Sequence, residues 1–435
     1  MGGDVLLGID EEGGTVTRLE AAHGSTLPGA AQLGRVDDAA VTRAAGAELG
    51  RRVRASGANV ALAPVADVNS NPRNPVIGTR SFGDRGAFVA RHVAAMVGGV
   101  QDAGVAACVK HFPGHGDTAV DSHVGLPRVS LPLGTVESEH LPPFQAAIDA
   151  GVAAVMTSHV VVEALGELPA TLDARVLRML RERGFGGAIV TDALDMAAIR
   201  AEFGAGPGAV RALLAGADLL CIGNPSDLGP KRGASGDEAD YVEVRDALLA
   251  AVDDGTLPVA ALERASASVA RLSEWVASRP EPVPASPFDA AAIVRRAIGV
   301  HGSPGLAAGP RIVLDLRDRA SGAVASTAEP FAVALGAVGF RVGPLGSPES
   351  AAALSDALGS APADAAITVL VDAVQPGSPQ RQALGTLAAA RPQAILVNTG
   401  LPAPDALPLP TVDAFGSSRV TAVVVAEALA GMSGA

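Results

Sequence analysis

The side chains best suited to chemistry gather between Lys110 and Pro127, in the sequence KHFPGHGDTAVDSHVGLP, which holds three histidines, two aspartates and three glycines. Imidazole and carboxylate groups are ligands that Zn²⁺ and similar ions accept, so a metal site is one interpretation. The stretch lacks the i, i+4 helical pairing of zinc motifs and is interrupted by glycines. A metal site is therefore the less favoured interpretation.

Proton transfer is the other interpretation. Asp121 and His123 are separated by one residue, so both side chains project from the same side of an extended loop, and the carboxylate could orient the imidazole and raise its basicity. A histidine held in this way can donate a proton to a leaving group near neutral pH. A single histidine is usually a packing or surface residue, but three within thirteen residues, beside a lysine and two aspartates, are hard to ascribe to packing.

A further carboxylate, Asp192, ends the apolar run of AIVTDALDM at 188–196. A carboxylate at the end of a buried strand is costly unless it is paired or lies in a solvated cleft. It would then be available for chemistry. Alternatively, Asp192 could cap the N-terminus of a helix that begins just after it. The spacing alone leaves both interpretations open.

Six short runs rich in Val, Ile and Leu predict the strands that position these residues, and each is followed by a helical pattern. The runs are 5–10, 60–67, 106–111, 153–159, 187–193 and 217–223. Apolar residues at helical spacing predict helices at 37–57 and 172–186. Alternating strands and helices indicate an α/β fold with parallel strands.

Polar residues follow several of these runs, namely Asp10, Asp67, Lys110 with His111, His159 and Asp192. A barrel of parallel strands places chemistry all around this rim, whereas an open doubly wound sheet binds its ligand at one switch point. The pattern therefore predicts a (β/α)₈ TIM-like barrel. A complete barrel needs eight strands, and the first of the six runs begins almost at Met1. We therefore expect the first one or two βα units to be absent and closure to be imperfect.

Proline-rich sequence at 278–289 predicts a linker between two domains. The barrel domain is expected at 1–277 and a smaller α/β sandwich at 290–435, with strands at 311–316, 366–373 and 393–400. No independent catalytic constellation is evident in the second domain.

Composition fits a globular protein, with 48% hydrophobic and 18% charged residues. A net charge of -13 offers no basic surface for nucleic acid or anionic lipid, so neither partner is expected. No apolar run approaches a membrane span, and the N-terminus has no signal-peptide pattern. The two cysteines, Cys108 and Cys221, lie in apolar runs and are predicted to be buried thiols.

Five segments resemble glycoside hydrolase family 3, in its bacterial β-N-acetylglucosaminidase branch. They are KHFPGHGDTAVDSHVGLP, IDEEGGTVTRL (9–19), PVIGTRSFGD (75–84), VMTSHVV (155–161) and PATLDARVLRMLRERGFGGAIVTDALDM (169–196). The resemblance runs from about residue 5 to 275 in the family's order. The C-terminal domain is similar to the sandwich that many members append.

The resemblance implies roles for the residues that match the family's motifs. Asp192 matches the nucleophile that forms a covalent glycosyl-enzyme, and Asp121 with His123 matches the acid–base pair of this branch. Sugar binding is implied for four residues: Asp10, Arg80, Lys110 and His111. Glu11 stands where the family commonly has Gln. The sugar-binding role is implied for Asp10, so this difference does not affect it.

The implied enzyme is a retaining exo-β-N-acetylglucosaminidase that removes terminal GlcNAc from peptidoglycan fragments (muropeptides) without metal or cofactor. Three alternatives remain: a GlcNAc phosphorylase, an inactive sugar-binding protein with an incomplete barrel, and a metal-dependent hydrolase. An incomplete barrel would expose a strand edge and favour self-association. The lack of a signal predicts the cytoplasm, although an export or lipoprotein signal could lie in the N-terminal part that the missing strands predict.

Overall fold

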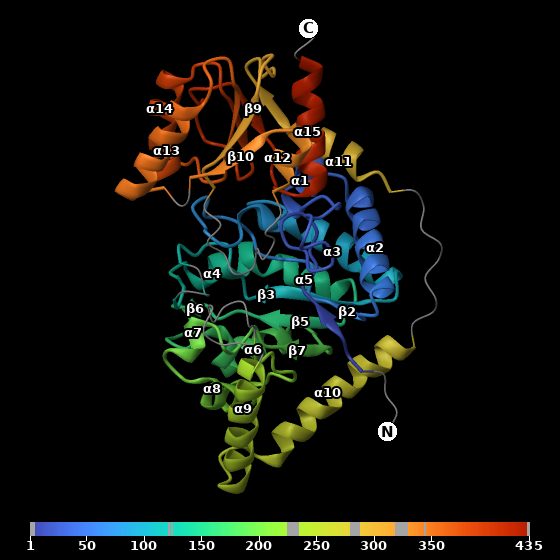
Figure 1. Cartoon of the computed structure of the whole chain (residues 1–435). Coiled ribbons are helices and arrows are strands. Elements are labelled where there is room, and N and C mark those ends of the chain that lie inside the picture. The colour runs from blue at the N-terminus through green and yellow to red at the C-terminus, as the bar shows by residue number, and fades with distance from the viewer. Residues whose placement is uncertain are drawn as a thin grey trace.

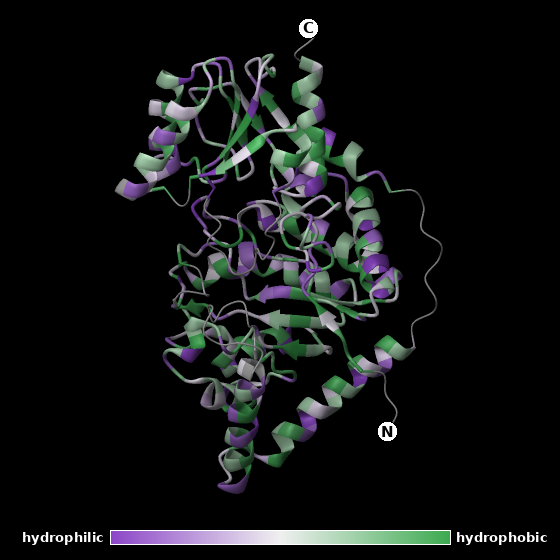
Figure 2. Cartoon of the chain, viewed as in Figure 1, coloured by the Kyte–Doolittle hydropathy of each residue, from purple (hydrophilic) through white to green (hydrophobic). Residues whose placement is uncertain are grey.

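Two mainly parallel sheets, each flanked by helices, make up most of the molecule (Figure 1). The computed structural model describes residues 5–120, 122, 125–223, 235–278, 288–317, 329–342 and 345–432. Apolar residues concentrate in the strands of both sheets (Figure 2). The α/β class predicted from the sequence, a TIM-like barrel unit followed by an α/β sandwich, is confirmed.

The first sheet has the order β1-β2-β3-β5-β7, and all neighbouring strands run parallel. Its strands are β1 (Gly8–Ile9), β2 (Val60–Ala61), β3 (Ala106–Phe112), β5 (Ala154–Thr157) and β7 (Ala188–Val190). The sixth predicted run joins β7 through a single parallel bridge between Val190 and Leu219. Each predicted strand thus adds beside the previous one, as in a barrel. A separate small pair consists of β4 (Arg128–Val129) and β6 (Val161–Val162).

Helices and short helical turns connect these strands, and the longer ones pack against one face of the sheet. They are α1 (Ala30–Val36), α2 (Ala39–Ala55), η1 (Gly78–Arg80), α3 (Gly86–Asp102), α4 (Leu133–Thr135), η2 (Val136–His140), α5 (Pro142–Asp149), η3 (Ala170–Leu172), α6 (Ala174–Glu182), α7 (Ala197–Arg200) and α8 (Ala205–Ala215). The two predicted helices, α2 and α6, begin after Asp38 and Asp173, whose carboxylates accept backbone N–H groups of the first turn. Gly46 of α2 lets α3 approach closely, because a Cβ there would lie 2.6 Å from the Met96 carbonyl oxygen.

The opposite face of the sheet packs partly against a helix from further along the chain. Cys108, Met156 and Val190 form one apolar cluster with Leu272 and Trp275. The latter two belong to α10 (Val259–Ala277), which follows α9 (Ser235–Asp253) and runs past the sheet in Figure 1. Among the described residues, no strand pairing joins β1 to the bridge at Leu219. The sheet is open at this point, and α10 covers part of the face that would line a closed barrel.

The second sheet has the order β10-β9-β11-β12-β13-β8, with only β8 antiparallel. Its strands are β8 (Gly299–His301), β9 (Arg311–Asp315), β10 (Val338–Arg341), β11 (Ala366–Val371), β12 (Ile395–Asn398) and β13 (Thr411–Asp413). Its helices are α11 (Ala290–Ala297), α12 (Pro330–Leu335), α13 (Pro348–Ser360), α14 (Pro379–Ala390) and α15 (Arg419–Met432). One apolar cluster includes residues of α13 and α14, and another includes residues of α12 and α15, which gives the sandwich.

The second sheet's helices and loops dock on the region around α1. The buried side chain of Gln32 donates to the Ala414 carbonyl oxygen and to the Thr421 hydroxyl, both at 2.8 Å. The guanidinium of Arg35 lies 5.0 Å from the centre of the Phe415 ring. The two units therefore share a polar contact that water does not reach.

The predicted linker falls mostly outside the described residues, at 279–287, so the domain limits 1–277 and 290–435 stay a prediction. Among the helices in the described ranges, none combines the length and apolarity that a membrane crossing requires.

Gln32→Ala should lower the free energy of unfolding by about 1–3 kcal/mol, because it leaves the buried carbonyl oxygen of Ala414 without its donor and removes a second contact at Thr421. Urea unfolding followed by circular dichroism measures the change. Gln382→Ala is the control, since Gln382 is exposed and makes only a 3.4 Å contact. Equal losses in both variants would contradict the importance of the buried contact.

Candidate active site

A cavity of about 210 Å³ opens at the carboxyl ends of the first sheet's strands. Five of the seven predicted site residues line it: Asp10, Arg80, Lys110, His111 and Asp192. They come from three strand ends and from η1, and positions far apart in the chain meet because parallel strands end at one edge of the sheet. The other two, Asp121 and His123, lie outside the described residues, so their acid–base role stays a prediction.

Lys110 and Arg80 are held by a buried carboxylate that the sequence interpretation missed. Glu12 accepts two hydrogen bonds from Arg80, at 2.7 and 3.0 Å, and lies 2.7 Å from the Lys110 ammonium. Lys110 also donates to Asp10 at 2.5 Å. The side chains of Glu12, Arg80 and Lys110 are all at most 7% exposed. The signal that could have found Glu12 is the second acidic residue of IDEEGG, two positions after Asp10.

Glu12 and Lys110 stay charged in this cluster. Burial alone would raise the pKa of Glu12, but the charges of Arg80 and Lys110 outweigh it and hold that pKa far below its usual range. Burial opposes the charge on Lys110 as well, yet the charges of Asp10 and Glu12 raise the pKa of its ammonium. The cavity is therefore lined by fixed charges that can form strong hydrogen bonds with a polar ligand.

The loop after β1 brings a further cation to the cavity. One oxygen of Glu11 accepts the Thr17 hydroxyl and the backbone N–H groups of Arg18 and Leu19, which fixes this loop. Arg18 lines the cavity with one guanidinium nitrogen 3.5 Å from Asp10. Its Nη1 atom is buried and has no hydrogen-bond partner among the described residues. Arg18 was not predicted as a site residue, although it lies in the quoted segment IDEEGGTVTRL.

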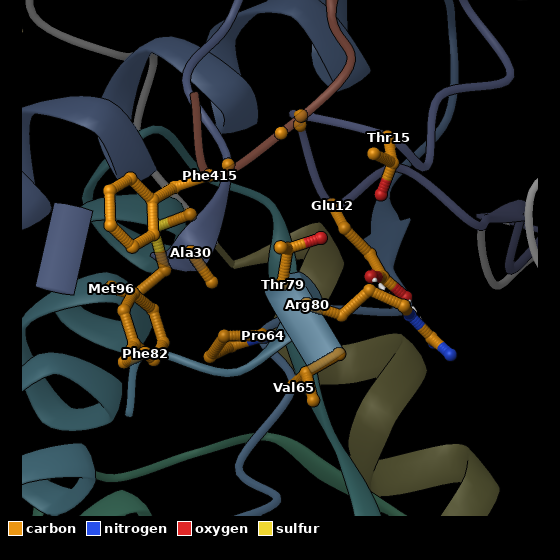
Figure 3. A pocket seen from close by; sticks show the side chains of 14 residues that line it. Glu12, Thr15, Ala30, Pro64, Val65, Thr79, Arg80, Phe82, Met96 and Phe415 are labelled. Carbon is orange, nitrogen blue, oxygen red and sulfur yellow. Dashed lines mark hydrogen bonds and ion pairs between the residues drawn. The ribbon is translucent and has the colours of Figure 1, made fainter. Parts of the chain in front are cut away.

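A second, smaller cavity lies behind the pair of Glu12 and Arg80 (Figure 3). Its volume of about 20 Å³ is enough for roughly one water molecule. Phe82 and Met96 line it from the first unit, and Phe415 lines it from the second. The loop after β13 thus closes the back of the charged cluster.

His111 is oriented by another buried carboxylate, Asp67. Asp67 accepts the backbone N–H groups of His111 and His115, at 3.3 and 2.7 Å, and lies 2.7 Å from Nδ1 of His111. Burial would raise the pKa of Asp67, but the His111 charge and hydrogen bond lower it. Because a carboxylate only accepts, the proton lies on Nδ1 of His111 and its orientation is fixed.

His115 and Asp117 tie the loop to its surroundings. The His115 ring contacts the Thr118 hydroxyl at 2.8 Å through Nδ1 and the Ser122 hydroxyl at 3.1 Å through Nε2. Burial lowers the pKa of His115 to about 4, so the ring is neutral. Asp117 accepts the Ser70 hydroxyl at 2.8 Å.

Asp192 does not cap a helix. Its Oδ1 accepts the N–H of Ala193 at 2.8 Å, whereas α7 begins only after Met196, which occupies the N-cap position. The capping alternative is therefore wrong, because the chain makes a non-helical turn between β7 and α7. Asp192 is left at a strand end beside the cavity.

Among the described residues, no group of three or more His, Cys, Asp or Glu side chains is placed to hold a metal ion. Both cysteines are free thiols; Cys108 is buried as predicted, and Cys221 is partly buried and lines the cavity. Burial raises the pKa of each thiol to about 12, so neither is a ready nucleophile.

Comparison with known proteins shows the family of this chain. The model of the glycosyl hydrolase family 3 N-terminal domain matches residues 2–272. The chain belongs to glycosyl hydrolase family 3. It is 34% identical over 276 residues to a beta-hexosaminidase from Mycobacterium tuberculosis. This match covers 62% of this chain and 68% of that protein.

Two other proteins show different extents of similarity. The chain is 37% identical over 247 residues to beta-hexosaminidase A of Pseudoalteromonas piscicida, covering 52% of this chain but only 41% of that protein. A family 3 beta-N-acetylglucosaminidase structure from a Paenibacillus species superposes with a TM-score of 0.80 at 33% identity, covering 98% of this chain and 84% of that one. The family 3 fold therefore extends through both sheets.

Glu12→Gln should lower the free energy of unfolding at pH 7 by about 3–5 kcal/mol, because it leaves two buried cations without their counter-charge. The pKa of Glu12 is lowered on folding, so this stabilisation is present above the usual pKa of 4.5 and is lost as the pH falls below it. Chemical denaturation at pH 7 and pH 4 should show the difference shrinking at the lower pH.

Glu427→Gln provides the control, because its 3.0 Å pair with Arg295 is half exposed. It should change the free energy of unfolding by less than about 1 kcal/mol. A Glu12→Gln variant as stable as this control would show that the buried cluster does not need the charge.

Glu11→Gln should stabilise the protein at pH 7. Burial raises the pKa of Glu11 despite the hydrogen bonds it accepts, so the charged form costs stability above that pKa, and the cost disappears as the pH falls and the group is protonated. An amide oxygen can accept the same bonds. Thermal unfolding should show a higher Tm for the variant at pH 7 and equal Tm values near pH 4; a lower Tm at pH 7 would contradict this.

Proposed function

We propose that the protein is a retaining exo-β-N-acetylglucosaminidase in which Asp192 attacks the anomeric carbon of a terminal β-linked GlcNAc. The observation that carries the proposal is the strand-end carboxylate of Asp192, which faces the same cavity as Lys110, His111 and Arg80. The names of the family 3 relatives, beta-hexosaminidase and beta-N-acetylglucosaminidase, support this substrate class.

In the proposed first step, the Asp192 carboxylate forms a bond to the anomeric carbon while the glycosidic oxygen leaves with a proton. The Ala193 N–H donates to one oxygen of this carboxylate and so orients it at the end of the strand. His123, assisted by Asp121, is proposed to give that proton and then to take one from the water that releases GlcNAc. No metal or organic cofactor is needed for either step.

The fixed charges support binding of one sugar. Asp10 can accept hydroxyl protons, while Lys110 and Arg80 can donate to hydroxyl or acetamido oxygens. A cavity of about 210 Å³ accommodates a single sugar rather than a run of them, which supports cleavage at a chain end. The resemblance to the bacterial branch supports muropeptides as the natural source of this sugar and the cytoplasm as the compartment.

Asp192→Asn should lower kcat/KM on a chromogenic β-GlcNAc substrate at least about a thousandfold, because no nucleophile remains. Asp246→Asn, at an exposed site on α9, is the matched control and should keep full activity. Product analysis with added inorganic phosphate belongs to the same assay. Equal activity in both variants would contradict the role of Asp192. Release of GlcNAc-1-phosphate would show that the enzyme is a phosphorylase rather than a hydrolase.

A further inference from the structure

His159 lies beside the strand that carries Asp192, in surroundings that suit a structural support. It follows β5, which pairs with β7, and its side chain is fully buried. Its Nε2 atom lies 2.8 Å from the carbonyl oxygen of Ala193, the residue after Asp192. Its Nδ1 atom lies 2.9 Å from the Thr171 hydroxyl. Both ring nitrogens are therefore engaged with the protein.

The directions of these hydrogen bonds follow from the chemistry of the partners. A carbonyl oxygen only accepts, so Nε2 carries a proton and donates it to Ala193. The Nδ1 atom contacts the Thr171 hydroxyl, which also donates to the Ser158 carbonyl oxygen at 2.9 Å. The Thr157 hydroxyl lies 2.8 Å from that of Thr171. These contacts link Thr157, Thr171, His159 and the Ala193 carbonyl oxygen in one buried chain.

This chain ends on the backbone that orients Asp192. The Ala193 N–H donates to the Asp192 carboxylate, so the position of Ala193 sets the direction of that carboxylate. The peptide group between Ala193 and Leu194 is held from two sides. His159 contacts its carbonyl oxygen, and its N–H, on Leu194, donates to the Cys221 carbonyl oxygen at 2.9 Å. A displacement of a reacting group by about 1 Å can cost about a hundredfold in rate.

We infer that His159 is a positioning residue for Asp192, whose Nε2–H fixes the Ala193 carbonyl. The inference rests on the proposed role of Asp192 as nucleophile. It assigns to His159 no proton transfer to substrate, since its ring is buried and both nitrogens are bonded within the protein. Fixed polar contacts of this kind pre-organise a site before substrate binds.

His159→Ala should lower kcat on the β-GlcNAc substrate about a hundredfold. The inhibition constant of free GlcNAc should stay within about twofold of wild type, because the charged cluster at Asp10 and Lys110 does not use His159. The pH–rate profile should fall at every pH and keep its shape, whereas loss of a general acid or base would remove one limb. His159→Gln, whose amide N–H can reach the same carbonyl, should recover about tenfold of the loss.

The neighbouring Ser158 offers a matched control. Its hydroxyl is buried but has no hydrogen-bond partner among the described residues, so Ser158→Ala should retain activity within about twofold. Thr171→Val removes the hydroxyl that contacts Nδ1 and should reduce kcat about tenfold, between the control and His159→Ala. The Tm of each variant separates these effects from loss of the fold.

Several results would overturn the inference: unchanged kcat in a folded His159→Ala variant, loss of one pH limb, or no recovery with Gln. Inactivity of the wild type on β-GlcNAc would instead count against the proposed function. The His159 assignment then still has its own readout, the ¹⁵N NMR signal of its imidazole, identified by its absence from His159→Gln. A signal of a protonated Nε2 is expected, and an Nε2 without a proton would refute the assignment.

Discussion

The buried carboxylate of Glu12 is the interaction on which the charged wall of the site depends. It brings Arg80 of η1 and Lys110 of β3 to one point beside the end of β1. Two cations this close, with so little solvent, would repel each other and each would carry a large desolvation cost. Glu12 offsets both effects, so the donors that face the cavity are held in place before any sugar arrives.

The same logic recurs around the rest of the cavity. Lys110 forms an ion pair with Glu12, and His111 is hydrogen-bonded to Asp67. Asp192 accepts the backbone N–H of Ala193. In each case the group that faces the cavity is fixed by a partner that faces away from solvent. Such networks rigidify a site only if each member is satisfied, which explains why so many polar side chains of this barrel unit are fully buried.

The local sequence predicts the strands better than it predicts which charged side chains pair with one another. Runs such as 106–111 and 187–193 are apolar over several residues and end in polar ones, which is enough to place Lys110 and Asp192 at one rim. Glu12 and Arg80 are 68 positions apart, and Asp67 and His111 are 44 apart, so their pairing leaves no spacing pattern. The capping interpretation of Asp192 was wrong because residue types alone do not show that the helix begins only at Ala197.

The second sheet also contains elements that the local sequence does not predict. β9, β11 and β12 were evident from their Val, Ile and Leu content, but β10 is exposed along its whole length and β13 is only three residues long. Likewise, the amphipathic pattern of α10 predicts a helix with one buried face but not that this face covers an open sheet. Tertiary packing, rather than local preference, decides these elements.

The cavity behind Glu12 has a consequence for how the protein is made. Glu12, Arg80 and Lys110 leave the ribosome early, whereas Phe415 and Gly416, which close that cavity, follow about 300 residues after Lys110. Until the loop after β13 docks, water reaches Glu12 from behind and its ion pairs are only partly desolvated. The full burial of Glu12 therefore depends on residues of the second unit as well as on the first sheet.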